Sequence, residues 1–77
     1  MRLTSNYSFD FEKQSETYYK LLCEEDFDFK TKNITIEVRL ENSLVLVEVR
    51  ANCVLDLKIA TSALIKSLEI IERTLNV

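Results

Sequence analysis

Apolar residues recur at helical spacing along residues 52–77, a stretch without glycine or proline. One narrow sector of the helical wheel holds Leu57, Ala60, Leu64, Leu68, Ile71 and Leu75. This pattern predicts an amphipathic helix whose apolar stripe lies on another layer of the protein. Asn52 is the expected N-cap, because an asparagine side chain can accept a hydrogen bond from the first turn.

Three other stretches each predict a β-strand, two by alternation of apolar and polar residues and one by a short apolar run. Residues 2–11 place Leu3, Tyr7, Phe9 and Phe11 on one side, and residues 33–41 do the same with Ile34, Ile36, Val38 and Leu40. Residues 44–50 are apolar on both faces at their start. Asn42 and Ser43 lie between the last two strands and predict a tight hairpin turn, since asparagine tolerates the left-handed conformation.

Residues 13–25 show a helical period, with Tyr18, Leu21 and Leu22 on one face. The acidic residues 24–26 are expected to mark the end of this helix, because negative charge is unfavourable at a helix C-terminus. Residues 27–32 then form a polar connection that contains Phe27 and Phe29. We expect at least one of these two rings to cover the edge of the core.

These elements predict an α+β fold with the order β-α-β-β-α in a single domain, residues 1–77. A helical crossover makes the strands 2–11 and 33–41 parallel to each other. The strand 44–50 is the most apolar and suits the central position, antiparallel to both. We therefore predict a three-stranded antiparallel sheet of order 1-3-2 with both helices on one face.

Composition excludes most catalytic and metal chemistry. The chain has no histidine and no glycine, so it lacks the commonest general base and any glycine-rich phosphate loop. Two cysteines alone cannot supply an ordinary four-ligand zinc site. Cys23 and Cys53 are expected as free thiols, although a disulfide between them stays open. We predict no enzyme, no metal and no cofactor.

Length and charge point to a protein partner. A chain of 77 residues buries only about 60% of its unfolded surface, so a partner is the favoured source of further stability. The net charge of −3 is a poor basis for nucleic-acid binding by this chain alone. No signal-peptide or membrane-spanning apolar run is found, which predicts a cytoplasmic protein without membrane contact.

The predicted C-terminal helix carries a second apolar set, Ile59, Ala63 and Ile70, beside its main stripe. This flank is either a broad core face or a docking surface. The small residues Ala63 and Ser67 would let a partner helix approach closely. The open sheet face around Leu44 and Leu46 is the alternative interface.

Three strings in order resemble the small Pcc-type subunit of the KEOPS complex, which makes threonylcarbamoyl-adenosine in archaeal and eukaryotic tRNA. They are residues 18–25 (YYKLLCEE), 42–49 (NSLVLVEV) and 57–68 (LKIATSALIKSL). The third string departs from the family pattern, because Lys58, Ser62 and Ala63 replace arginine, asparagine and serine. These departures also fit a divergent paralogue that caps a standard Pcc-type subunit, as the Gon-type subunit does.

The resemblance implies a non-catalytic dimerisation subunit, paired with itself or with a Pcc-type paralogue. It would hold the threonylcarbamoyl transferase subunit through its helical face and reach tRNA indirectly through the complex. The predicted partner-binding residues are Ile59, Ala63, Lys66 and Ile70, with Lys58 and Ser62 as candidate contacts for tRNA or a partner. The alternative is a stand-alone KH-like RNA-binding module, which the missing glycine-rich loop and the negative charge disfavour.

Overall fold

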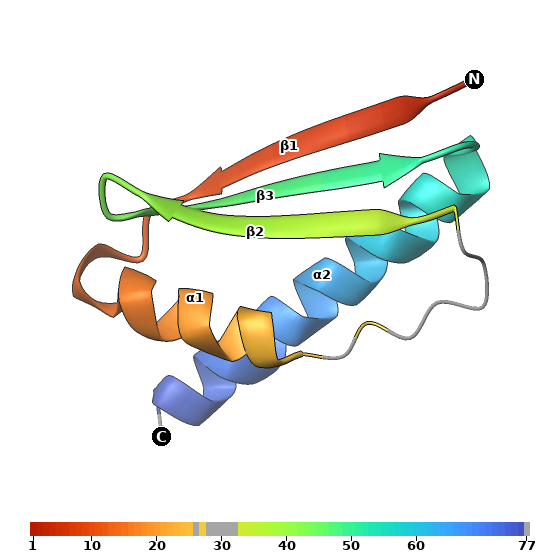
Figure 1. Ribbon diagram of the computed structural model, residues 1–77. Helices are drawn as coiled ribbons and strands as arrows, with labels where there is room; N and C mark the ends of the chain where they lie inside the picture. Colours follow the sequence, from red (N-terminus) through yellow and green to blue (C-terminus); the bar gives the residue numbers. More distant parts are fainter. Residues whose placement is uncertain (26, 28–32, 77) are drawn as a thin grey trace.

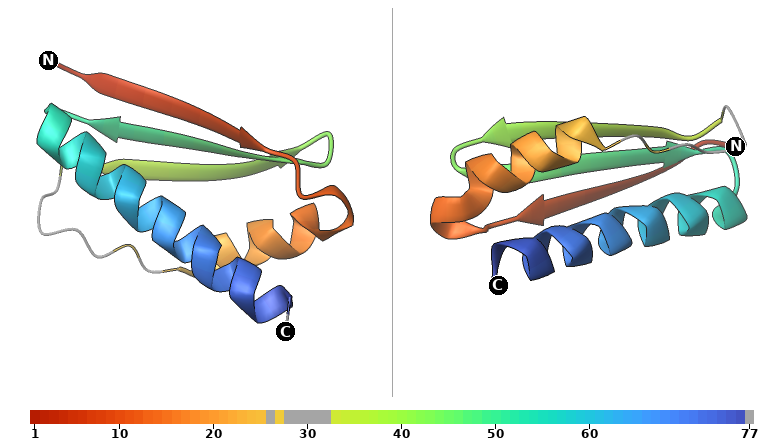
Figure 2. Two further views of the ribbon diagram at one scale, coloured as in Figure 1. Left: turned by 180° about the vertical axis from the view of Figure 1, so that it is seen from behind. Right: turned by 90° about the horizontal axis from the view of Figure 1, so that it is seen from below.

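The computed structural model describes residues 1–25, 27 and 33–76, and it has the predicted α+β architecture (Figure 1). The elements are β1 (Leu3–Phe9), a 3₁₀ turn η1 (Glu12–Gln14), α1 (Ser15–Glu24), β2 (Thr35–Glu41), β3 (Leu44–Ala51) and α2 (Val54–Leu75). The sheet order β1-β3-β2 confirms the prediction. Both helices cover the same face of the sheet, as the two further views in Figure 2 show.

The central strand β3 is antiparallel to both of its neighbours. Its register places Ala51 opposite Leu3 of β1, and Arg50 opposite Thr35 of β2. Every second side chain of β3 is buried under the helices, namely Val45, Val47, Val49 and Ala51. The most apolar strand therefore lies in the middle, where both edges and one face are covered.

The turn between β2 and β3 is tight, as predicted, although it contains no glycine. Asn42 and Ser43 have φ angles of 52° and 65°, so both are in the left-handed region. Two successive residues with positive φ are characteristic of the type I′ hairpin turn, whose twist matches that of the strands.

The first helix begins later than its sequence pattern predicted. Residues 12–14 form a 3₁₀ turn, and α1 proper starts at Ser15. The side chain of Ser15 explains the change, because its buried Oγ accepts a hydrogen bond from the backbone N–H of Phe11 at 3.1 Å. The helix ends at Glu24, in agreement with the acidic stop predicted there.

The expectation that Asn52 caps the second helix is wrong. Cys53 has extended backbone angles, and its carbonyl accepts the first helical hydrogen bond from Leu57 N–H at 3.1 Å, which makes Cys53 the N-cap. β3 continues through Ala51, so only Asn52 and Cys53 connect it to α2. Both Cys23 and Cys53 are free thiols, as favoured from the sequence.

The core lies between β3 and the predicted stripe of α2. Ala60, Leu64, Leu68 and Ile71 are buried, and Leu57 and Leu75 pack against them. α1 contributes Tyr18 and Leu22. Phe27 packs on this core, which confirms that one of the two connecting rings covers its edge, while Phe29 lies outside the described residues.

Candidate partner-binding site

The predicted contact residues form a stripe along α2 that is not buried by the rest of the chain. Ile59, Ala63, Lys66 and Ile70 follow the spacing i, i+4, i+7 and i+11, which aligns them on one side of a helix. Ile59 is 46% exposed and Ile70 is 54% exposed, while Ala63 is half-buried and Lys66 is exposed. We call these four residues the α2 flank.

The α2 flank borders the core but does not belong to it. The buried sector of α2 is already filled by Ala60, Leu64 and Leu68 against the sheet. At about 100° per residue, Ile59 and Ile70 lie some 120–140° from Leu64, so their side chains point outward and sideways. Lys58 and Ser62 are both exposed, but only Ser62 lies next to the α2 flank, about 40° beyond Lys66. Lys58 lies about 140° from Ala63, on the same side of the helix as Ile65, so the structure brings five of the six predicted residues together.

The sequence pattern predicted that Ser67 would let a partner helix approach, but the structure gives it an internal role. It is buried, and its Oγ donates a hydrogen bond to Oε1 of Glu25 at 3.2 Å, just after the end of α1. The small side chain admits the end of α1 of the same chain. Of the two small residues singled out from the sequence, only Ala63 stays accessible from outside the chain.

Further exposed apolar side chains on α2 were not singled out from the sequence. Val54 and Leu55 are 68% and 65% exposed at the start of the helix, and Ile65 is 46% exposed on the side opposite to the α2 flank. The helical wheel already contained the signal for Leu55, which lies about 180° from Leu64. These residues enlarge the apolar area that the isolated chain leaves in contact with water.

The open face of the sheet is more polar than α2. A cluster of charges spans β2 and β3, where Arg50 forms ion pairs with Glu37 at 3.0 Å and with Glu48. The hydrogen bond to Glu48, together with the charges of both carboxylates, raises the pKa of the Arg50 guanidinium. Leu44 and Leu46 are half-buried on this face, and a shallow hollow of about 290 Å³ adjoins Leu46.

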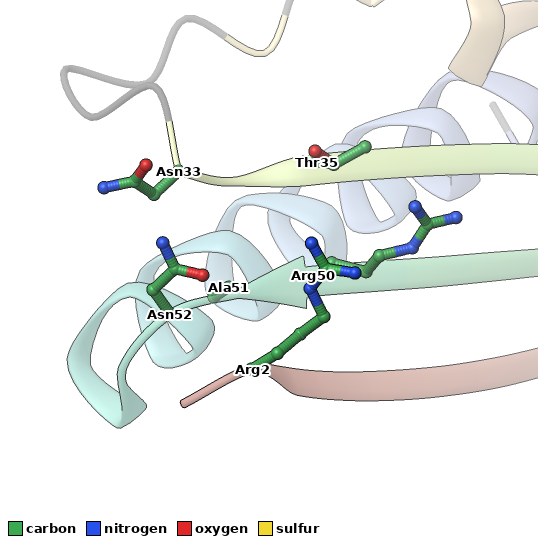
Figure 3. A pocket seen from close by; sticks show the side chains of 6 residues that line it. All are labelled: Arg2, Asn33, Thr35, Arg50, Ala51 and Asn52. Carbon is green, nitrogen blue, oxygen red and sulfur yellow. The ribbon is translucent and has the colours of Figure 1, made fainter.

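A second hollow, of about 210 Å³, lies where β3 leads into α2 (Figure 3). It is lined by Arg2, Asn33, Thr35, Arg50, Ala51 and Asn52. Two guanidinium groups, those of Arg2 and Arg50, line this hollow, and that of Arg50 is paired with Glu37 and Glu48. The hollow offers a weak basis for phosphate binding, in agreement with the net charge of −3.

Over residues 1–25, 27 and 33–76, no group of three or more Cys, Asp or Glu side chains is placed to hold a metal ion. Neither α1 nor α2 has the length and apolarity needed to cross a bilayer.

Comparison with known proteins returns one result. The family model described as "Transcription factor Pcc1" matches residues 2–76, which is nearly the whole chain. No curated protein and no solved structure matches it.

Proposed function

We propose that this chain, which belongs to the Pcc1 family of KEOPS subunits, is a non-catalytic scaffold subunit of the KEOPS tRNA-modifying complex. In this role it supports the transfer of a threonylcarbamoyl group to an adenosine of tRNA by the partner transferase subunit. The observation that carries the proposal is the family match over residues 2–76, which covers every element of the fold. The family is one of accessory subunits without catalysis.

The α2 flank is the proposed docking surface for the transferase subunit. Ile59 and Ile70 present exposed apolar side chains, whose burial against a partner would contribute favourable free energy of binding. Ala63 between them is small and half-buried, so a partner helix can approach closely there. Lys66 adds a charged group at the rim, where charges contribute to orientation and specificity. Exposed Lys58 and Ser62 are proposed to contact the same partner or tRNA.

The chain is further proposed to form a dimer, with a second copy or with a Pcc-type paralogue, in the cytoplasm. Its small core and the exposed apolar residues of α2 support a need for additional buried surface. Contact with tRNA is proposed to occur through the assembled complex, since the chain carries ten basic against thirteen acidic side chains.

Direct nucleic-acid recognition by the isolated chain has little support. A KH-like module clamps the backbone of RNA with a glycine-rich loop, and this chain contains no glycine. The words "transcription factor" describe the family, and the net charge of −3 gives this chain little basis for binding DNA on its own.

A reconstituted modification assay tests the proposal. The chain alone is expected to be inert towards ATP, threonine and tRNA, because it has neither a histidine to act as general base nor a glycine-rich loop to hold phosphate. Added to a mixture of the transferase subunit, an activated threonylcarbamoyl donor and tRNA, it is expected to increase the yield of threonylcarbamoyl-adenosine. Transfer by the chain alone would end the scaffold proposal, and so would an assay in which adding it changes nothing.

A further inference from the structure

A hollow of about 260 Å³ lies between the end of β1, α1 and α2, on the other side of α2 from the docking surface proposed above. It is lined by Phe9, Phe11, Tyr18, Ile65, Leu68, Glu69 and Glu72. Ile65 is two residues from Ala63, and at about 100° per residue the two side chains lie on opposite flanks of the helix. A partner could therefore use this hollow while another occupies the α2 flank.

The walls of the hollow are apolar and aromatic. Phe11 stacks on Tyr18 with ring centroids 3.6 Å apart, and Phe9 stacks on Phe11 at 5.6 Å. The rings continue the core outward, and Leu68 closes the hollow from α2. Ile65 lines the hollow and is 46% exposed, so almost half of its surface is in contact with water.

The rim of the hollow is negatively charged. Glu69 is balanced by Arg73, whose Nη2 lies 2.7 Å from its Oε1. Glu72 forms no ion pair with any of the residues that the structure describes. Its charge acts on the neighbouring aromatic wall, where burial first and Glu72 second raise the pKa of Tyr18. An unbalanced carboxylate thus lies beside an apolar cavity.

Size and charge together define the occupant. The volume is close to the lower bound of the roughly 300–1,000 Å³ of small-molecule pockets, and it leaves room for one inserted side chain. An arginine has an aliphatic stem for apolar walls, a planar head that stacks on aromatic rings, and a fork that pairs with a carboxylate. We propose that this hollow receives an arginine side chain of a partner protein, with its stem against Ile65 and Leu68 and its guanidinium on Glu72.

The test is an NMR titration of the labelled full chain with N-acetyl-argininamide, up to about 100 mM because one side chain binds weakly. The matched probe is N-acetyl-citrullinamide, which has nearly the same shape but no charge. We expect saturable shifts centred on Phe9, Phe11, Ile65 and Glu72 with the arginine probe. The citrulline probe is expected to bind about two- to fivefold more weakly, since it cannot form the ion pair with the exposed Glu72.

Two variants make the assignment specific. Glu72→Gln is expected to remove the preference for the charged probe while the fold is kept, because this side chain is exposed. Glu16→Gln on α1 is the control, since its carboxylate pairs with Lys20 at 3.2 Å and does not line the hollow. Equal binding of both probes, shifts centred elsewhere, an unchanged preference in Glu72→Gln, or no saturable shift would each overturn the proposal.

Discussion

Two adjacent residues of α2 lie in different environments, one in the core and the other in the proposed docking surface. Leu64 is fully buried against the sheet, whereas Ala63 is half-buried in the α2 flank. A long charged side chain at either position meets a different environment. The pair therefore distinguishes loss of binding from loss of folding.

Ala63→Arg is expected to abolish binding of the transferase subunit while the fold is retained. Placing an unpaired charge in a closely packed interface costs about 3–5 kcal/mol, whereas in the free chain the arginine can extend into water. Circular dichroism and a pull-down with the transferase subunit measure the two effects separately.

Leu64→Arg is the control and should unfold the chain, because its charge would be buried in the core. If Ala63→Arg melts as Leu64→Arg does, the flank is core and the docking surface is wrong. If Ala63→Arg folds and binds every partner normally, the interface lies elsewhere, most directly on the sheet face around Leu46.

Ionisation of Tyr18 is expected to lower the stability of the protein at alkaline pH. Burial and the charge of Glu72 raise its pKa above the ordinary 10.0 in the folded state. The unfolded chain then loses the proton first, so the stabilisation is complete below about pH 10 and is lost as the pH rises further. Urea unfolding at about pH 9 and about pH 11 is expected to show a smaller loss for Tyr18→Phe than for the natural chain.

Tyr19 is the comparison for this measurement. Its hydrogen bond with the Cys23 thiol raises its pKa as well, so Tyr19→Phe should also reduce the loss, although Tyr19 is only partly buried and packs on the outside of the core. An identical alkaline loss in the natural chain and in Tyr18→Phe would contradict the assignment.

At the scale of elements, the sequence predicted what depends on periodicity and missed what depends on single side chains. The sheet order followed from the apolar surplus of β3, and the buried stripe of α2 followed from helical spacing. α1 starts at Ser15 and not at residue 13 because the Ser15 hydroxyl accepts a hydrogen bond from the backbone of Phe11, and a periodic pattern does not contain that contact. The N-cap of α2 is Cys53 and not the predicted Asn52, because β3 extends to Ala51.

The candidate site was predictable only in part for the same reason. The wheel placed Ile59, Ala63 and Ile70 beside the core, and the structure shows Ile59 and Ile70 about half exposed. The internal role of Ser67 depends on where α1 ends in space, since Glu25 reaches it across 42 residues of sequence. The exposed Ile65 indicates a binding hollow only in the folded protein, where aromatic residues from β1 and α1 line the hollow with it.

The hairpin between β2 and β3 provides a prediction for one element. Ser43 has a φ angle of 65°, which is costly for a residue with a Cβ atom and free of strain for glycine. Ser43→Gly is therefore expected to stabilise the protein by about 1 kcal/mol, visible as a higher midpoint of urea unfolding.

Ser8→Gly in β1 is the matched control. Ser8 is exposed on an extended strand, where glycine lowers stability by about 0.5–1 kcal/mol. A Ser43→Gly variant that loses stability as Ser8→Gly does would show that the turn does not have the described geometry.

At the scale of the molecule, a thin sheet with two helices on one face leaves much apolar surface uncovered. Val54, Leu55, Ile59, Ile65 and Ile70 are all at least 46% exposed along α2. A chain of 9.0 kDa has little core to offset this exposure. The proposed KEOPS role gives this surface a partner, and the family match over residues 2–76 gives the proposal its direction.

The most direct measurement is native mass spectrometry of the chain alone and mixed with the transferase subunit, at micromolar concentration. We predict a species heavier than 9.0 kDa for the chain alone and a complex with the transferase in the mixture, which Ala63→Arg does not form. A single 9.0 kDa monomer in every mixture, with a sharp melting transition that does not depend on concentration, would contradict the scaffold proposal.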